Sequence, residues 1–224
     1  YICPERNGAS RREGRASLGV TNDEFLFAYF GFVDERKGVE TLLEAFQIVA
    51  HKRENVRLIF IGGGKGTLTD PSDQLSARKR DYEQQMDELS KQLGIADKII
   101  WTKGYTFESE QPSIYLRAAD ACTLPYDEGI RMNRSSFAAA AAHGLPIITT
   151  RGDILESPFV DQRNILLCEP RNRETLAAAM ERLISNPELQ ARLKKGALEL
   201  AHEWFSWDRA VERTVNALSN QKKA

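Results

Sequence analysis

Apolar residues follow two alternating patterns along this chain. Short continuous runs have the length and composition of buried strands, and they cover residues 25–31, 56–61, 98–102, 121–124, 144–150 and 164–168. Between and after these runs, apolar residues recur every three or four positions. That spacing predicts helices at residues 38–52, 80–93, 112–118, 135–143, 172–185, 187–203 and 206–219. Gly94 and the pair Asn186-Pro187 mark helix boundaries.

The order of these elements predicts an α/β fold. Strands that alternate with helices form a doubly wound parallel sheet, here of about six strands, with helices on both faces. We expect residues 1–22, which are polar and arginine-rich, to be an exposed lead-in or interdomain linker. Residues 23–205 then form the α/β domain and residues 206–224 a C-terminal helix. The polar stretch 65–81, which contains Pro71, is predicted to be a loop.

Composition and charge exclude several classes of protein. The 224 residues include 31 Lys and Arg against 32 Asp and Glu, a net charge of −1. No overall field therefore attracts nucleic acid, and we expect no nucleic-acid partner. No apolar run approaches the ~20 residues that cross a bilayer. The first residues lack both an initiator Met and the apolar core of a secretory signal, which favours a fragment of a longer protein.

Cysteine and histidine usage points to a reducing compartment. Cys3, Cys122 and Cys168 are too few and too scattered for a disulfide framework, and the last two lie in apolar segments. We expect free thiols and a cytoplasmic location, which could include the inner face of a membrane. The three histidines are far apart, so no spacing suggests a zinc site, and we expect no bound metal.

Ligands of doubly wound folds bind beyond the carboxyl ends of the strands, so those loops are the candidate sites. The loop after the first strand runs from Gly31 to Gly38 and opens directly into a helix. Free N–H groups and the helix dipole favour an anion there, and Lys37 adds a full positive charge. A solvated loop lysine is the alternative.

The loop after the second strand, Gly62-Gly63-Gly64-Lys65-Gly66-Thr67, invites comparison with a phosphate-binding loop. It lacks the Walker spacing, which needs four residues between the first Gly and Gly-Lys-Ser/Thr. No G-x-G-x-x-G pattern fits either. We interpret this loop as a flexible turn.

The loop after the fourth strand, residues 125–136, is the richest in polar chemistry. Asn133, Ser135 and Ser136 are residue types that cap helices, and Arg134 lies among them at a predicted helix start. This combination suits a phosphate or pyrophosphate. The alternative is ordinary capping beside a solvated arginine. Asp127 and Glu128 suggest either an acid/base pair or two solvated carboxylates.

Several motifs, taken in order, resemble the donor domain of a known enzyme family. They cover residues 27–46, 58–64, 100–105, 115–125, 143–150 and 204–207, and the overall match extends over residues 24–219. The family is that of the retaining group 1, or family-4-type, GT-B glycosyltransferases. The chain resembles the C-terminal, nucleotide-sugar-binding half of such an enzyme, which is Rossmann-like.

The resemblance implies a function as well as a fold. Such enzymes transfer a hexosyl group from a nucleotide-diphosphate sugar, with retention at the anomeric carbon. The acceptor, a glycan or a lipid-linked molecule in polysaccharide biosynthesis, is held mostly by the N-terminal domain. No metal or other cofactor is expected. Because half of the cleft is absent, we expect the chain alone to be inactive.

Individual site residues follow from the same resemblance. Lys37, with Gly31 beside it, matches the family lysine that contacts the donor phosphates, and Phe32 occupies the usual position of an arginine. Gly104 and Tyr105 match the turn that borders the nucleotide base. The segment Asn133, Arg134, Ser135 and Ser136 matches the cradle for the pyrophosphate.

Two glutamates of the family are missing in register. Their positions, counted back from Gly144, hold Arg131 and Ala139. Glu128 lies three residues upstream of Arg131 and is the candidate substitute, with a catalytic role beside Lys37. The missing pair also motivates an alternative, a catalytically degenerate domain for nucleotide-sugar binding or assembly. A related GT-B phosphorylase or epimerase is a third possibility.

The last predicted helix carries an apolar stripe, Ala210, Val211, Val215 and Leu218. In the resembling family this helix reaches back toward the first domain. We expect the stripe to be partly exposed in this chain, where it could join two copies in a dimer. Packing on the chain's own sheet is the alternative.

Overall fold

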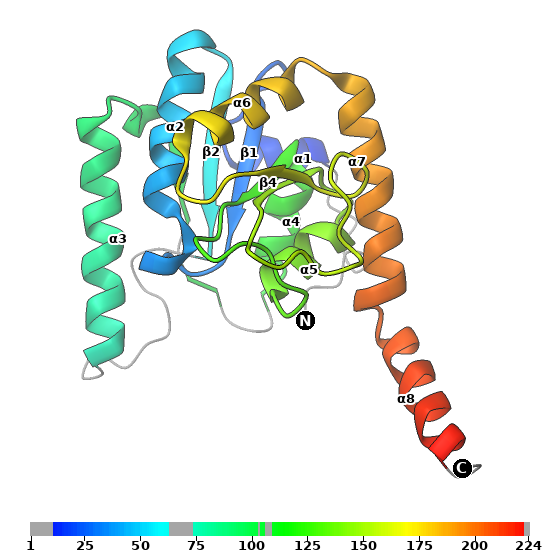
Figure 1. Cartoon of the computed structure of the whole chain (residues 1–224). Coiled ribbons are helices and arrows are strands. Elements are labelled where there is room, and N and C mark those ends of the chain that lie inside the picture. The colour runs from blue at the N-terminus through cyan, green and yellow to red at the C-terminus, as the bar shows by residue number, and fades with distance from the viewer. Residues whose placement is uncertain (1–10, 63–73, 103, 106–108, 222–224) are drawn as a thin grey trace.

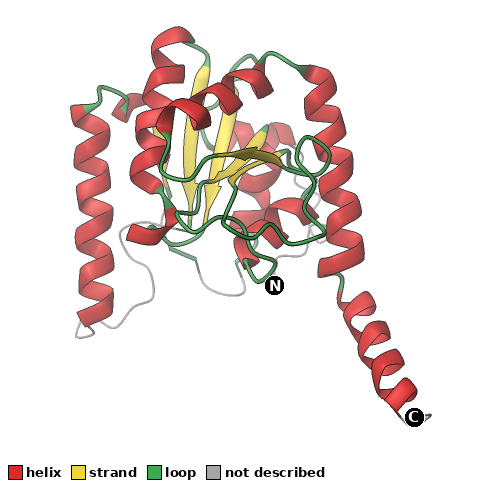
Figure 2. Ribbon diagram, viewed as in Figure 1, coloured by secondary structure: helices red, strands yellow, loops and turns green. Residues whose placement is uncertain are grey.

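The computed structural model describes residues 11–62, 74–102, 104, 105 and 109–221. Its centre is a sheet of six parallel strands in the order β3-β2-β1-β4-β5-β6 (Figure 2). The strands are β1 (Phe25–Phe30), β2 (Val56–Ile61), β3 (Ile99–Trp101), β4 (Ala121–Leu124), β5 (Ile147–Thr150) and β6 (Leu166–Cys168). All six lie within the predicted runs, so the predicted doubly wound α/β fold is confirmed.

The strand order reverses between β1 and β4, where Ala28 is paired with Cys122. The connections after β1 and β4 therefore run in opposite directions and place their helices on opposite faces of the sheet. Helix α2 (Val39–Lys52) follows β1 and packs against α6 (Arg173–Ile184). Helix α5 (Ser135–Ala142) follows β4 and packs against α7 (Pro187–Leu200). This reversal creates the crevice in which such folds bind ligands.

Among the described residues, four more helices lie outside the sheet, three of them around the core and one, α8, beyond it (Figure 1). They are α1 (Arg11–Ser17), α3 (Gln74–Gln92), α4 (Gln111–Ala118) and α8 (Trp207–Gln221). Short 3₁₀ turns lie at Glu35–Lys37 and Ala96–Lys98, and a π-helical turn lies at Ala201–Phe205. The predicted break between the helices at Asn186-Pro187 is confirmed, since Asn186 accepts a hydrogen bond from Leu189 N and Pro187 opens α7.

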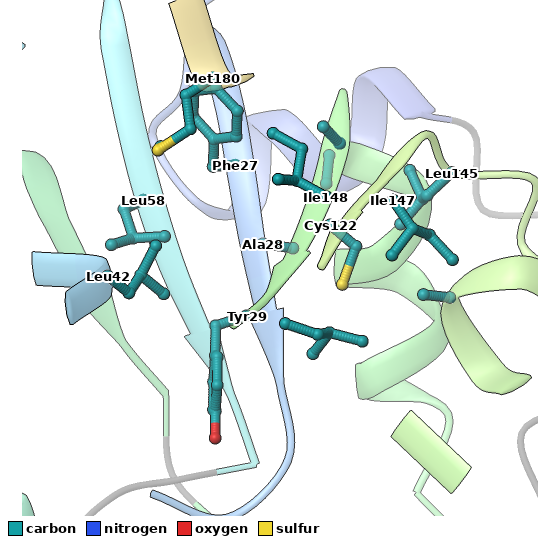
Figure 3. Packing of buried hydrophobic residues seen from close by; sticks show 14 of the residues in the cluster. Phe27, Ala28, Tyr29, Leu42, Leu58, Cys122, Leu145, Ile147, Ile148 and Met180 are labelled. Carbon is teal, nitrogen blue, oxygen red and sulfur yellow. The ribbon is translucent and has the colours of Figure 1, made fainter. Parts of the chain in front are cut away.

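Side chains from the sheet and from its covering helices form one core (Figure 3). Phe27 of β1, Leu58 of β2 and Ile148 of β5 are fully buried, as are Leu42 of α2 and Met180 of α6. Because both faces of the sheet are covered, both sides of each central strand must be apolar. The continuous apolar runs in the sequence have this origin.

Both described cysteines are free and buried, as predicted. Burial disfavours the thiolate and raises the pKa of Cys122 and Cys168 to about 12. Cys3 lies outside the described residues. No helix within the described part of the chain is long and apolar enough to cross a lipid bilayer.

Helix α1 was not predicted, and it lies inside the segment 1–22 that we interpreted as an exposed lead-in. Arg15 is only 2% exposed and donates hydrogen bonds to the carbonyls of Thr21, Glu24 and Ala118. It also pairs with Asp120 at 3.1 Å. An arginine that satisfies several backbone carbonyls is buried despite its charge, so polar composition alone misled the prediction for residues 11–17.

Helix α3 begins six residues before its predicted start, so the prediction of a loop over 65–81 is wrong from Gln74 onward. Residues 74–92 are rich in Gln, Lys, Arg and Glu, which favour helix but provide little apolar periodicity. Residues 63–67, which we interpreted as a flexible glycine turn, lie outside the described residues.

Helix α8 projects away from the sheet (Figure 1). Val211, Val215 and Leu218 are about half exposed, and Trp207 at the helix start is 72% exposed. The prediction that the apolar stripe of this helix is partly exposed is therefore confirmed. The helix does not pack on the sheet, because it turns away after the π-helical turn that ends at Phe205.

Candidate functional site

The loops after β1 and β4 meet beyond the carboxyl ends of the strands. Gly38, at φ 67°, lies so close to the loop after β4 that an added Cβ would be 1.9 Å from the Pro125 carbonyl oxygen. Asp127 N also donates a hydrogen bond to Arg36 O at 3.3 Å. Only a glycine permits this approach. The two loops consequently form one continuous surface at the point where the strand order reverses.

Two polar groups converge over Gly31, the first residue after β1. A Cβ built on Gly31 would lie 2.9 Å from Ser136 Oγ and 3.6 Å from Lys37 Nζ. Gly31 has φ 131°, which side-chain-bearing residues avoid. The sequence predicted these three residues as parts of one site, and the structure brings them together. A hydroxyl and an ammonium above bare backbone form a cradle suited to a phosphate oxygen.

The start of α5 leaves its N–H groups without a side-chain cap. We expected Asn133, Ser135 or Ser136 to cap this helix, but the N-cap residue is Arg134, which forms no capping bond. An arginine side chain has no acceptor atom, so it cannot cap. Asn172 and Asn186, in contrast, cap α6 and α7 with their side-chain oxygens. The uncapped end is the one beside Gly31, and it is available to an anion.

Arg134 does not extend into solvent as a simple loop arginine would. Its guanidinium carbon lies 4.8 Å from the centroid of the Tyr126 ring, and Nη2 lies 3.6 Å from Glu128 Oε2. Its Nε is buried and has no hydrogen-bond partner among the described residues. Of its neighbours, Asn133 and Ser135 are exposed and Ser136 is half-buried. Tyr126 was not predicted as a site residue, because no sequence spacing signals such a stack.

Phe32 and Lys37 also contact each other. Lys37 Nζ lies 5.6 Å from the centroid of the Phe32 ring, and Phe32 is 48% exposed. The Phe32 ring therefore lies beside the Lys37 ammonium. It occupies the position at which the resembling family usually has an arginine. A cation beside an aromatic face is attracted by the ring and keeps its full charge.

The segment around Arg131 is fixed to the loop after β5. Arg131 Nη1 donates to Ile154 O at 3.4 Å, and the Glu156 carboxylate accepts a hydrogen bond from Met132 N. Glu156 was not predicted, because no pattern in the loop after β5 distinguishes it from a solvated carboxylate. Its hydrogen bond with Met132 N fixes the segment that leads into α5.

Gly104 and Tyr105 lie beyond the end of β3, on the far side of β2 from β1. The Tyr105 ring meets the Tyr115 ring of α4 edge-on, with centroids 6.3 Å apart. Burial raises the pKa of Tyr105 to about 12, although a hydrogen bond with the Thr102 side chain opposes the shift. Tyr105 is therefore neutral near pH 7, and its ring forms an apolar wall.

A further contact ties the loop after β6 to this surface. Arg171 Nε lies 3.1 Å from Asp127 Oδ2. Arg171 has φ 52°, a left-handed conformation that is uncommon outside glycine. The sequence did not indicate this pair. Arg171 is an ion-pair partner for the Asp127 carboxylate. Asp127 therefore joins two loops instead of standing alone in solvent.

Taken together, the switch point carries an ammonium, a guanidinium, hydroxyls and open helix N–H groups. These groups favour a ligand with concentrated negative charge, such as a diphosphate.

Known proteins resemble this chain in sequence. Residues 10–200 match the sequence profile of the family described as glycosyl transferases group 1. An uncharacterised glycosyltransferase of Methanocaldococcus jannaschii is 24% identical over 204 residues, which are 90% of this chain and 46% of that protein. A D-inositol 3-phosphate glycosyltransferase of Thermomonospora curvata is 26% identical over 232 residues, covering 97% and 48%. The chain spans about half the length of these curated relatives.

Solved structures resemble it in fold. The C-terminal domain of a group 1 glycosyl transferase, LpcC from Francisella tularensis, matches with a TM-score of 0.72 and 20% identity over 92% of this chain and 96% of that one. HepE of Anabaena, crystallised with UDP-glucose, matches with a TM-score of 0.77 and 17% identity over 96% and 53%. The architecture described above is therefore that of a GT-B C-terminal domain.

Proposed function

This chain belongs to the glycosyl transferases group 1 family, and on that premise we propose that it is the donor-binding half of a retaining enzyme. In this proposal the enzyme transfers a hexosyl group from a nucleotide-diphosphate sugar to a glycan or a lipid-linked acceptor. One observation carries it: Lys37, Ser136 and the uncapped start of α5 converge at the strand-order reversal. The Anabaena relative was crystallised with UDP-glucose, which supports a donor of this class.

In the proposed mechanism, catalysis is electrostatic. When the bond between the sugar and the diphosphate breaks, negative charge develops on the departing nucleoside diphosphate. Lys37 Nζ and the free N–H groups at the start of α5 are fixed in place before that charge appears, so they stabilise it with little reorganisation. Gly104 and Tyr105 would border the base, and Asn133, Arg134, Ser135 and Ser136 the diphosphate.

Two further parts of this proposal follow from the family resemblance. Glu128 would replace the missing glutamate that helps to orient the sugar. We also expect that the enzyme needs neither a metal nor another cofactor. The acceptor would bind mainly to a second domain outside this chain, toward which α8 would extend. Such an enzyme would act in the cytoplasm, in polysaccharide biosynthesis.

The direct test uses the protein that contains both halves. It is incubated with UDP-, GDP- and ADP-sugars and a panel of glycan and lipid-linked acceptors, and release of the nucleoside diphosphate is measured. NMR of the product then gives the anomeric configuration, for which we expect retention. Lys37→Ala should lower kcat by at least about 10²-fold. Inversion, or full activity of Lys37→Ala, would contradict the proposal.

One observation favours a second function. Arg131 and Ala139 occupy the positions of the family glutamates, and the methyl group of Ala139 cannot hydrogen-bond a ribose hydroxyl. A degenerate domain that serves assembly or nucleotide sensing would show this pattern. It predicts no turnover with any donor in the two-domain protein, whatever the acceptor. A related phosphorylase would instead release a sugar phosphate.

A further inference from the structure

We propose that Tyr126 is a positioning residue of the donor site, whose ring holds the Arg134 guanidinium, and that Glu128 occupies this guanidinium until a diphosphate replaces it. The inference rests on the proposed function, because it concerns how the same site accepts its ligand. It gives Glu128 a role in the site before the ligand arrives, which precedes the sugar-orienting role proposed above. It also gives Arg134 two alternative partners, Glu128 or the ligand.

The Tyr126 ring is buried in the loop after β4. Tyr126 is 2% exposed, and its carbonyl accepts a hydrogen bond from the Thr150 hydroxyl at the end of β5. The backbone of this loop residue is thus tied to the sheet, and its ring is enclosed by neighbouring residues. Burial raises the pKa of Tyr126 well above its ordinary value, so the ring is neutral at physiological pH. A neutral, immobile aromatic face is a suitable support for a cation.

The Arg134 guanidinium has one N–H donor without an acceptor among the described residues. The guanidinium lies 4.8 Å from the Tyr126 ring centroid, yet its Nε is buried and unpartnered within the described part of the chain. A buried donor without a partner is unfavourable unless a ligand or water completes it. Arg134 is also the N-cap residue of α5, so its side chain starts beside the open N–H groups. A diphosphate at that helix end would supply the missing acceptor.

The Glu128 side chain is 67% exposed. Its Oε2 lies 3.6 Å from Arg134 Nη2, which is long for a charge-assisted hydrogen bond. Exposed pairs of this kind change an equilibrium by a factor of about five at most. A diphosphate carries more charge and can accept from several donors at once. The Glu128 pair is therefore weak enough to be displaced, and it neutralises Arg134 while the site is empty.

The hydroxyl of Tyr126 is not needed for this role. It is buried without a hydrogen-bond partner among the described residues. The Ser136 side chain lowers the pKa of Tyr126, against the larger effect of burial. The inference concerns the aromatic face alone. Tyr126→Phe keeps this face, whereas Tyr126→Leu removes it at similar bulk. This pair of variants separates the proposed role from general packing.

The experiment is calorimetric titration of this chain with UDP, GDP and ADP, using the nucleotide that the unmodified protein binds. We expect Tyr126→Phe to stay within about twofold of the unmodified protein, while Tyr126→Leu and Arg134→Ala each weaken binding about tenfold. The double variant should be no weaker than Arg134→Ala alone, because both changes remove the same interaction. Losses that multiply in the double variant would overturn the inference.

Glu128→Gln provides an independent arm that leaves Tyr126 unchanged, in case Tyr126→Leu fails to fold. It should tighten nucleotide binding about twofold to fivefold in an otherwise unmodified protein and leave an Arg134→Ala protein unaffected. Weaker binding by Glu128→Gln would overturn the inference even though the chain binds nucleotide. If the unmodified chain and the two-domain protein bind none of the three nucleotides, the proposed function fails first and this inference with it.

Discussion

The hydroxyl of Ser136 lies over the backbone of Gly31, so that a Cβ on Gly31 would be 2.9 Å from Ser136 Oγ. Gly31 belongs to the loop after β1, and Ser136 belongs to the first turn of α5, which follows β4. Lys37 Nζ approaches the same backbone and would lie 3.6 Å from that Cβ. A Cβ added at Gly31 must therefore displace the Ser136 hydroxyl, which we assign to the diphosphate site.

Gly31→Ala should therefore abolish or strongly weaken nucleotide binding. The new methyl group would push against Ser136, and φ of 131° is unfavourable for alanine. We expect a loss of about 1–3 kcal/mol in the free energy of unfolding and a loss of at least about tenfold in nucleotide affinity. Chemical denaturation and calorimetry measure the two quantities.

Gly19→Ala is the matched control for this variant. Gly19 also has a positive φ, 64°, but an added Cβ would meet no atom within 4 Å. The variant also places alanine at a positive φ, with a smaller backbone cost and no clash, and it should bind nucleotide normally. Equal binding by Gly31→Ala and Gly19→Ala would argue against a ligand above Gly31.

Arg15→Ala should destabilise the chain without affecting the site. Arg15 is 2% exposed, and its guanidinium satisfies three backbone carbonyls and Asp120. Removal of one partner of a buried ion pair costs about 3–5 kcal/mol. Urea denaturation should show this loss for Arg15→Ala, whereas Arg12→Ala, on the exposed side of the same helix, should stay within about 0.5 kcal/mol. Similar midpoints for the two variants would contradict the burial of Arg15.

His143 should make stability depend on pH. Its Nδ1 lies 2.8 Å from Ala139 O and its Nε2 lies 2.7 Å from Ser113 Oγ. A carbonyl only accepts, so Nδ1 carries a proton. In the neutral ring Nε2 accepts from the Ser113 hydroxyl, which is the form that burial favours. Burial, and then the charge of Arg117, hold the pKa of His143 below its ordinary value of 6.5.

The sign follows from linkage. Below pH 6.5 the unfolded chain binds a proton on this residue more readily than the folded chain does. The contribution of neutral His143 to the free energy of unfolding is fully present above that pH. It is lost as the pH falls through the pKa of His143 in the folded chain. The free energies of unfolding of the unmodified protein and of His143→Gln, measured by denaturation, should thus approach each other as the pH is lowered from 8 to about 5. The exposed His51→Gln control should parallel the unmodified protein, and identical slopes for all three would refute the prediction.

The apolar stripe of α8 should contribute little to the stability of this chain. Val215 is 54% exposed, so Val215→Asp should change the free energy of unfolding by no more than about 0.5 kcal/mol. Leu189 of α7 is fully buried, and Leu189→Ala should cost about 2–5 kcal/mol. A comparable loss for Val215→Asp would mean that α8 packs on its own domain. Sedimentation of this chain at rising concentration then tests whether the stripe joins two copies.

The strands were predictable because the sheet is covered on both faces, which makes each central strand continuously apolar. The 3.6-residue period predicted α2, α6 and α7 for the same reason, since each buries one face. It failed for α1 and for the first six residues of α3. In α1 the buried residue is Arg15, which bonds to backbone carbonyls, and the start of α3 consists mainly of polar residues that favour helix. Neither feature produces an apolar period.

The site was predictable only as far as loop position determines it. The switch-point rule selected the loops that contain Gly31, Lys37 and Ser136, and these residues do converge. The stack of Arg134 on Tyr126 depends on how one irregular loop folds back on itself, and the pair of Asp127 with Arg171 depends on how two loops distant in sequence meet. The missing cap of α5 was unpredictable as well, because three better capping residues surround Arg134 in the sequence.

The central claim, that the cradle over Gly31 binds the diphosphate of a nucleotide, is tested most directly by one calorimetric titration. The chain is titrated with UDP, GDP and ADP, with and without their sugars, and the series is repeated on Lys37→Ala. We predict saturable binding of one nucleotide and at least a tenfold loss in Lys37→Ala. Binding that is unchanged in Lys37→Ala, or no binding by this chain and by the two-domain protein, would contradict it.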